Sequence, residues 1–319
     1  MKIVSLLPAA SEILCDLGVI DNIHAVSHEC NYPELLKEKV QITSSTIPSN
    51  MEQKLIKEIS NEVAYIWINR PEKKNAMDFD VWFGIPDLVK EINEKEEAKC
   101  ILILGKGDSF SAGIDIATFM GDMNLNENLS STADDRRKTM KLIDDMQGSF
   151  TTIANSNIPV IALAHGFCIG GATSMISACD IRLSTKDAKF SIGETKLGLV
   201  ADVGALQRMP NIISKGDLRE LAFTGRHFDG GHAEKIRFVN AVYDNVEQLH
   251  EAGIKLAEEI AANSRHIVGG TKNVLDKGED LTTDQALDYV RLWNTSYLIS
   301  EDLKEGVTAF FEKRDPDFK

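Results

Sequence analysis

Short apolar runs, separated by polar and glycine-containing turns, predict alternating strands and helices along most of the chain. Helical spacing of three and four runs from Asp78 to Glu94 and from Thr132 to Ala154. After Gly198 the pattern is almost entirely helical. Short buried strands are predicted at residues 55–59, 63–68, 100–104, 159–163 and 181–183. The chain therefore reads as an α/β protein with a helical C-terminal third.

The predicted helix over residues 132–154 has a well-defined apolar face. Met140, Ile143, Met146 and Phe150 recur at spacings of three and four. Side chains at these spacings lie above one another on a helix, so we expect all four to lie in the core.

The first fifty residues form a separate pattern. Residues 3–7 and 23–26 predict two short strands, and residues 9–17 predict a helix closed by Gly18. This strand-helix-strand pattern ends by about residue 50, too early to complete an α/β domain. We therefore expect two parts, residues 1–50 and 51–319.

Two glycine-containing turns, each after a predicted strand, carry the main candidate chemistry. One is Ser111–Asp115 and the other is His165–Gly171. Glycine permits close backbone approach, and amides at a helix N-terminus point toward negative charge. A glycine turn serves equally well for tight packing, so each turn alone is weak evidence.

These two turns resemble the paired oxyanion-hole motifs of the crotonase superfamily, the enoyl-CoA hydratases and isomerases. Segments 69–77, 178–182 and 310–314 also match in the family's order, so the resemblance covers roughly residues 53–319. It implies a crotonase-like spiral of ββα units with a helical C-terminal region. The short α/β extension of residues 1–50 would precede it.

The resemblance also implies a site that stabilises the enolate of a coenzyme A thioester. The oxyanion donors would be the backbone amides of Ile114 and Gly171. Each preorganised donor contributes on the order of 3 kcal/mol to a transition state. Glu194 matches the family's shared acid/base residue.

Ser174 and Asp202 decide which reaction the resemblance favours. Ser174 stands where hydratases carry a glutamate and dienoyl-CoA isomerases an aspartate; a serine is no base near neutral pH. Asp202 matches the second proton-transfer residue of the dienoyl-CoA isomerases. It is alternatively the N-cap of a helix predicted from Val203 onward.

Further residues are implied as coenzyme A contacts. Those implied by resemblance are Lys74, Ala76, Ala112, Asp115, Ser174, Phe310 and Lys313. The last two reach the ligand from a neighbouring helix or subunit in the family, which implies a homotrimer or homohexamer. Lys313 is alternatively an ordinary charged helix residue.

The composition and charge of the chain limit the classes of partner that it is expected to bind. The chain of 319 residues is 43% hydrophobic, which is typical of a globular protein, and its formal charge is −14. That charge argues against nucleic acid and anionic membranes as partners. Coenzyme A phosphates therefore require a local basic patch. We expect no metal, and no cofactor apart from the coenzyme A of the substrate.

The cysteines and the N-terminus bear on location. Five cysteines without a CxxC pair indicate reduced thiols in the cytoplasm. Cys168 reads either as a nucleophile or as a small apolar turn residue, and the second reading is favoured. No apolar run reaches the length of about 18 residues that a membrane span needs, and no secretion signal is predicted.

Residues 3–12 and 26–33 resemble the opening of cobalamin-type periplasmic substrate-binding proteins. Such proteins close two lobes around a ligand, so a fragment of one lobe should not bind it. A gene fusion or an artefact of gene calling is the favoured explanation. His28, Glu29 and Cys30 invite a metal interpretation, but adjacent residues rarely share one ion without other ligands.

The sequence therefore favours an acyl-CoA double-bond isomerase of fatty-acid degradation, acting on dienoyl-CoA or enoyl-CoA. One alternative is an enoyl-CoA hydratase, in which Ser174 and an ordered water replace the absent carboxylate. Another is a noncatalytic binding protein with the crotonase fold.

Overall fold

The computed structural model describes residues 3–5, 23–26, 40–41, 53–122 and 132–318. The chain divides into two compact units, residues 1–52 and 53–319. In the first unit, the described residues form a parallel sheet in the order β1-β2-β3, with β1 (Ile3–Ser5), β2 (Ile23–Val26) and β3 (Val40–Gln41). The helix predicted over residues 9–17 and the metal candidates at 28–30 lie outside the described residues.

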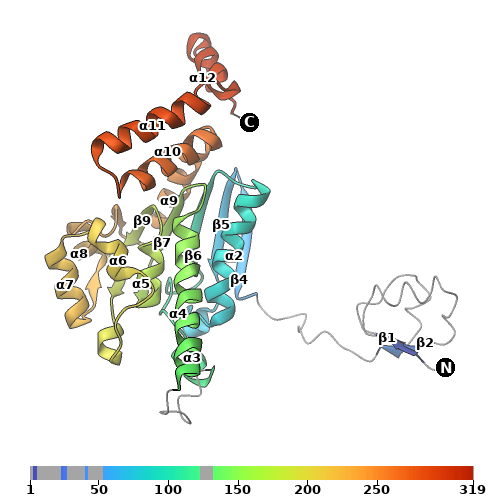
Figure 1. The fold of residues 1–319 in the computed structure, drawn as a ribbon, viewed down its shortest axis with the longest axis vertical. Coiled ribbons are helices and arrows are strands. Elements are labelled where there is room, and N and C mark those ends of the chain that lie inside the picture. The colour runs from blue at the N-terminus through green and yellow to red at the C-terminus, as the bar shows by residue number, and fades with distance from the viewer. Residues whose placement is uncertain (1–2, 6–22, 27–39, 42–52, 123–131, 319) are drawn as a thin grey trace. The chain divides into compact units, whose positions relative to one another are not determined.

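A six-stranded sheet forms the centre of the second unit (Figure 1). Its order is β12-β9-β7-β6-β5-β4; β4 runs antiparallel to β5, and the other pairs are parallel. The strands are β4 (Leu55–Ser60), β5 (Val63–Ile68), β6 (Cys100–Gly105), β7 (Val160–Ala164), β9 (Ile181–Thr185) and β12 (Ala241–Tyr243). The five predicted strands are confirmed, whereas β12 falls in the segment predicted to be helical.

Apolar side chains cover both faces of this sheet. In β6, Ile101 and Ile103 belong to one core cluster, and Leu102 and Leu104 belong to another. Helices α2 (Phe79–Lys95) and α4 (Ala133–Ala154) supply residues to the first cluster, and α9 (Val246–Ala261) supplies the second. A strand buried on both faces reads as a continuous apolar run, which is why the sequence predicted β6.

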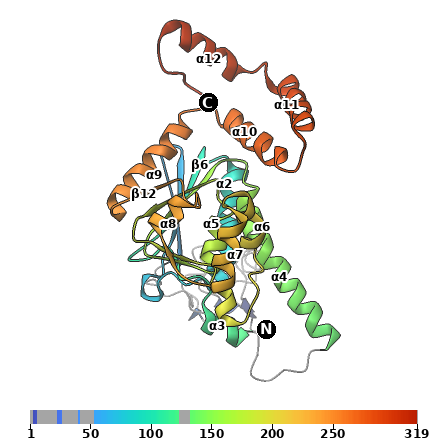
Figure 2. The ribbon, with the colours of Figure 1, turned by 90° about the vertical axis from the view of Figure 1, so that its left-hand side faces the viewer.

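Helix α4 confirms the predicted bounds but not the whole predicted core face. Thr132 caps its N-terminus through a reciprocal pair of hydrogen bonds with Asp135. Met146 and Phe150 are buried, but Met140 is 63% exposed, so its prediction as core is wrong. The N-terminal part of α4 extends away from the rest of the unit (Figure 2).

A second, smaller sheet connects the two glycine turns to the rest of the unit. Its order is β11-β10-β8, with β8 (Phe167–Ile169), β10 (Lys189–Ser191) and β11 (Phe228–Asp229). The second turn, residues 165–171, leads directly into α5 (Gly171–Ile176), but it contains the short strand β8, which the sequence did not predict. The segment between β9 and Gly198 contains β10 and the 3₁₀ helix η4 (Glu194–Leu197).

The remaining elements are mostly helical. Helices α10, α11 and α12 extend away from the central sheet (Figure 1, orange to red). No helix among the described residues is long and apolar enough to cross a membrane. The elements not yet given are η3 (Pro71–Lys73), α3 (Ile116–Asp122), α6 (Ala205–Arg208), η5 (Met209–Asn211), α7 (Lys215–Thr224), α8 (Gly230–Lys235), α10 (Arg265–Gly278), α11 (Thr283–Tyr297) and α12 (Glu301–Glu312).

Candidate active site

The first glycine turn presents the backbone amide of Ile114. The Gly113 carbonyl accepts the Met77 N–H at 2.7 Å, and in a trans peptide the Ile114 N–H points the opposite way. Among the described residues this amide has no recorded hydrogen-bond partner. Gly113 has φ +88°, and a Cβ there would lie 2.4 Å from the Ile169 carbonyl oxygen. Only glycine fits this turn.

The second turn presents the amide of Gly171, the first residue of α5. The Gly170 carbonyl accepts the Ser174 N–H at 3.0 Å, so the Gly171 N–H of the same peptide points away from the helix. Gly170 has φ +54°. A Cβ on Gly171 would lie 2.7 Å from the ring of Trp82, so this close packing also requires glycine.

The two turns lie side by side. The Ser111 N–H donates to the Phe167 carbonyl at 2.8 Å, and the Ser111 carbonyl accepts the Ile169 N–H at 3.2 Å. The Gly171 nitrogen lies 3.5 Å from the point where a Gly113 Cβ would stand. Among the described residues neither the Ile114 amide nor the Gly171 amide has a hydrogen-bond partner, and the two adjoin one another, as an oxyanion hole requires.

Glu194 lies against the second turn. Its Oε1 is 3.5 Å from the point where a Cβ on Gly170 would stand, and its buried Oε2 has no hydrogen-bond partner among the described residues. Burial raises the pKa of Glu194, and the charge of Asp202 raises it further. A carboxyl with a raised pKa is suited to proton transfer near neutral pH.

Asp202 follows Glu194 by one loop. Partial burial raises its pKa, although the residue as a whole is exposed. The alternative role as a helix N-cap is wrong, because α6 begins at Ala205 and its N-cap is Gly204. The Asp202 backbone is held by the Gln147 side chain, which donates to its carbonyl at 2.6 Å. This contact holds the backbone that carries the Asp202 carboxyl.

Ser174 lies in α5, one turn after Gly171. The residue is 0% exposed, and its hydroxyl has no hydrogen-bond partner among the described residues. A buried hydroxyl without a hydrogen-bond partner destabilises the fold, and a bound water or ligand can supply the missing hydrogen bond. It cannot replace a carboxylate as a base.

The loop implied for coenzyme A contacts the first glycine turn. Lys74, at φ +50°, accepts the Ala112 N–H on its carbonyl at 2.9 Å. The Ala76 carbonyl accepts a hydrogen bond from the Arg70 guanidinium. The Lys74 ammonium lies 4.5 Å from the centre of the Phe167 ring. Three of the implied contacts, Lys74, Ala76 and Ala112, are thus brought together.

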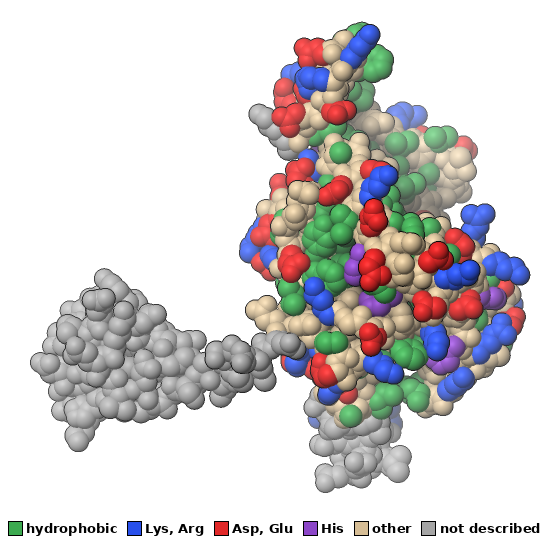
Figure 3. All heavy atoms as spheres, turned by 180° about the vertical axis from the view of Figure 1, so that it is seen from behind, with side chains coloured by type: hydrophobic (Ala, Val, Ile, Leu, Met, Phe, Trp, Pro, Cys, Tyr) green, Lys and Arg blue, Asp and Glu red, His purple; other side chains and the backbone are tan. Residues whose placement is uncertain are grey.

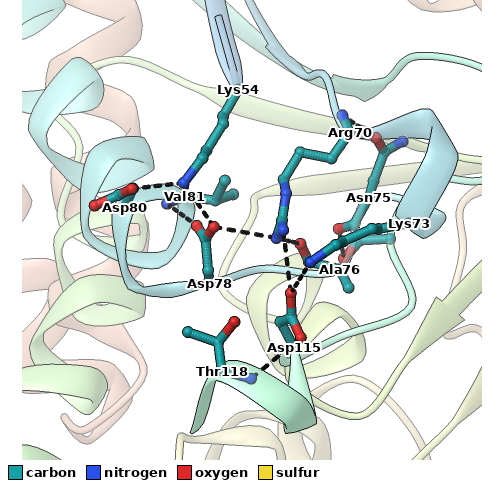
Figure 4. A network of polar contacts seen from close by, with 11 residues as sticks. Lys54, Arg70, Lys73, Asn75, Ala76, Asp78, Asp80, Val81, Asp115 and Thr118 are labelled. Carbon is teal, nitrogen blue, oxygen red and sulfur yellow. Dashed lines mark hydrogen bonds and ion pairs between the residues drawn. The ribbon is translucent and has the colours of Figure 1, made fainter. Parts of the chain in front are cut away.

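The Asp115 carboxylate is bound by side chains and a backbone amide of the same chain (Figure 4). Its carboxylate accepts hydrogen bonds from Arg70 and Lys73, both at 3.1 Å, and from the Thr118 N–H at 3.4 Å. Burial alone would raise the pKa of Asp115, but these two cations outweigh burial and hold it below its usual range. Both carboxylate oxygens of Asp115 therefore hold the loops around the first turn together.

Phe310 and Lys313 are not brought to this site within one chain. Both lie at the end of α12, and Phe310 is 77% exposed. Their implied contact across a subunit boundary stays a prediction. Cys168 is 0% exposed, and burial raises the pKa of its thiol well above neutrality, which favours the packing role over the nucleophile.

Charge is distributed differently around the site than over the surface. On the face shown in Figure 3, Lys and Arg side chains alternate with Asp and Glu, without one dominant basic patch. Near the first turn, however, Lys73 and Lys74 follow one another, and the Lys189 ammonium lies 5.5 Å from the Phe167 ring that Lys74 also covers. This group is a candidate for the predicted local basic patch.

Sequence reasoning missed the side chain of Asn75. It is 0% exposed and donates to the carbonyls of Lys106 at 2.8 Å and Ser109 at 2.6 Å, while it accepts the Arg70 N–H at 2.7 Å. It thus ties the coenzyme A loop to the first glycine turn. Its positive φ of 55° is a conformation that asparagine tolerates, but no local pattern identifies its distant partners.

A separate cavity of about 1180 Å³ lies beside α10. Asp180, Arg182 and Lys272 are among its lining residues, and Glu194 and Asp202 are not. Lys272 pairs with Asp180 at 2.5 Å, which ties α10 to β9. We assign this cavity no part in the chemistry.

Known proteins resemble this chain in both sequence and fold. The sequence model described as "Enoyl-CoA hydratase/isomerase" matches residues 58–319. A mitochondrial Delta(3,5)-Delta(2,4)-dienoyl-CoA isomerase of Dictyostelium discoideum is 40% identical over 83% of this chain and 90% of the relative. A peroxisomal one of Arabidopsis thaliana is 37% identical over 82% and 94%. The crystal structure of an enoyl-CoA hydratase from Bacillus anthracis, 26% identical, superposes with a TM-score of 0.74 over 84% of this chain and 99% of that one.

Proposed function

Because the chain belongs to the enoyl-CoA hydratase/isomerase family, we propose that it converts 3,5-dienoyl-CoA thioesters into their 2,4-dienoyl isomers. The observation that carries this proposal is the arrangement of acids at the oxyanion turns. Glu194 lies against the second oxyanion turn, the charge of Asp202 raises its pKa, and the third acidic position is the neutral Ser174.

The reaction needs one proton removed and one delivered. Loss of a C2 proton gives an enolate conjugated with both double bonds, and its oxygen is stabilised by the Ile114 and Gly171 amides. Protonation at C6 then gives the 2,4-diene. Two carboxyls, one ionised and one protonated, suit this transfer, and the charge of one raises the pKa of the other.

Hydration is the less supported reaction. Activation of water in the paired-carboxylate manner requires a second acid at Ser174, and the hydroxyl there cannot take a proton near neutral pH. The hydratase alternative would depend on a water held by the Ser174 hydroxyl and Glu194. The noncatalytic alternative gives no reason for the buried Oε2 of Glu194, which has no hydrogen-bond partner among the described residues.

We also propose the finer features of the enzyme. The acids and amides suffice for proton transfer, so no cofactor is assigned beyond the coenzyme A of the substrate. A role in fatty-acid β-oxidation follows from the substrate class. A homotrimer or homohexamer would cover the exposed rings of Phe310 and Phe311. A cytoplasmic location accords with the free thiols of Cys100, Cys168 and Cys179, although the names of the two isomerase relatives place them in organelles.

The test is a panel of 3,5-dienoyl-, 3-enoyl- and 2-enoyl-CoA substrates of equal chain length, followed by ultraviolet absorbance and mass. We expect conversion of the 3,5-diene without gain of water. Robust hydration of the 2-enoyl substrate, with both other substrates inert, would contradict the proposal. Incubation in D₂O then shows which carboxyl serves C2, because a variant lacking only the C6 donor still exchanges the C2 proton.

A further inference from the structure

The Ser111 hydroxyl lies where three parts of the site meet. It donates to the Asn75 carbonyl at 2.7 Å and accepts the Gly113 N–H at 3.1 Å. Its backbone pairs with β8 through Phe167 and Ile169. Ser111 is 0% exposed, so solvent does not replace either hydroxyl bond.

These contacts bear directly on the Ile114 amide. Gly113 has no side chain to restrict its backbone, so its orientation depends on hydrogen bonds to its two peptide groups. The Ser111 hydroxyl holds the Gly113 N–H, and the Met77 N–H holds the Gly113 carbonyl. With both bonds made, the direction of the Ile114 N–H is fixed.

The same residue also bears on the second donor. Ser111 pairs with β8 on both sides of Cys168, and β8 ends two residues before Gly171. One residue therefore sets the orientation of the first amide through its hydroxyl and the distance to the second amide through its backbone. Donors aimed in advance at the developing charge need no reorganisation during the reaction.

We propose that Ser111 is a positioning residue of the oxyanion hole. Its hydroxyl aligns the Ile114 amide with the Gly171 amide, and it touches neither the substrate nor the transferred proton. The inference rests on the proposed function only in assuming a thioester enolate. It applies to any reaction of this site that passes through one.

Ser111→Ala removes the hydroxyl but keeps the backbone pairing with β8. We expect kcat for the 3,5-dienoyl-CoA to fall by about 10- to 100-fold, since misplacement of a preorganised group costs up to about 10²-fold. KM should stay within about twofold, because the coenzyme A loop loses one hydrogen bond but is still held by the Asn75 side chain, which donates to the carbonyls of Lys106 and Ser109. Ser109→Ala is the matched control: Ser109 is 3% exposed, its carbonyl is kept, and its hydroxyl holds neither turn.

A second readout does not depend on isomerase activity. Acetoacetyl-CoA forms an enolate that absorbs in the near ultraviolet, and an aligned oxyanion hole should favour that form. We expect wild type and Ser109→Ala to induce the enolate band, and Ser111→Ala to weaken it while still binding coenzyme A itself normally. A wild type that induces the band yet isomerises no diene would reject the proposed function and leave this inference standing.

Wild-type kcat and enolate absorbance in Ser111→Ala would overturn the inference. An equal loss of binding for coenzyme A and acetoacetyl-CoA would also overturn it, because that outcome indicates a general structural role. If the alanine variant does not fold, Ser111→Cys carries the test. Its thiol is a weak donor and acceptor, so the loss in kcat and enolate band should be smaller but in the same direction.

Discussion

Two groups of acidic side chains in this molecule have opposite environments. Asp78 and Asp115 lie in a network with Lys54, Arg70 and Lys73, at oxygen-to-nitrogen distances of 2.7 to 3.3 Å (Figure 4). Burial tends to raise the pKa of both carboxyls, but the cations outweigh it and lower them. These acids are ionised and held in place.

Glu194 and Asp202 have no such cations recorded among the described residues. Burial raises the pKa of both, and the charge of Asp202 raises that of Glu194 further. The comparison shows how one fold separates two uses of a carboxyl. Paired acids fix the loop that orients the amides, and unpaired acids keep a proton available for transfer.

The largest expected effect is the loss of turnover in Glu194→Gln. An amide cannot exchange the proton, so turnover should fall by at least about 10²-fold with acyl-CoA binding little changed. Steady-state kinetics with the 3,5-dienoyl-CoA, together with calorimetric binding of a saturated acyl-CoA, measure both quantities. Turnover equal to wild type would remove Glu194 from the mechanism.

Next in size is the effect of Asp115→Asn on stability. The variant leaves the buried Arg70 guanidinium with Asp78 as its one recorded carboxylate partner, at 3.3 Å, so the free energy of unfolding should fall by about 2 kcal/mol at pH 7. Denaturant unfolding measures it. The pKa of Asp115 is lowered in the fold, so the difference from wild type should shrink as pH falls through that lowered pKa.

The sequence predicted the features that depend on local pattern and missed those that depend on distant contacts. The strands around Cys100 and Val160 were predicted because apolar runs report burial directly, and the glycine turns were found because positive φ needs particular residues. Strand β8 and the buried Asn75 were missed, since their partners are distant in sequence. Met140 was wrongly predicted to lie in the core, because helical spacing alone does not indicate where a helix extends beyond the core.

Glu194→Gln should stabilise the fold, by less than Asp115→Asn destabilises it. At pH 7 an unfolded glutamate is ionised, whereas burial in the fold opposes that charge, and the Glu194 Oε2 has no hydrogen-bond partner among the described residues. The neutral amide should therefore raise the free energy of unfolding by about 1 kcal/mol. The pKa of Glu194 is raised in the fold, so protonation favours the wild type in acid. The advantage of the variant should therefore disappear below about pH 4.3, the value for an unfolded glutamate. A variant less stable than wild type at pH 7 would contradict this account.

The smallest expected effect separates the two causes of the raised pKa of Glu194. Burial is the larger cause and the charge of Asp202 the smaller, so Asp202→Asn should lower the pKa of Glu194 only in part. The isomerisation rate cannot report the pKa of Glu194 in this variant, because Asp202 is itself proposed to transfer a proton. The 13C carboxyl resonance of Glu194, followed through a pH titration, reports it directly. We expect the titration midpoint of Glu194 in Asp202→Asn to move to lower pH and still lie above that of an exposed glutamate.

Gln147, which holds the Asp202 backbone, offers the matched control. Gln147→Ala keeps the Asp202 charge and should leave the Glu194 midpoint nearly unchanged. An unchanged midpoint in Asp202→Asn would mean that the two carboxyls titrate independently. The proposed transfer by one ionised and one protonated carboxyl would then lose its electrostatic basis.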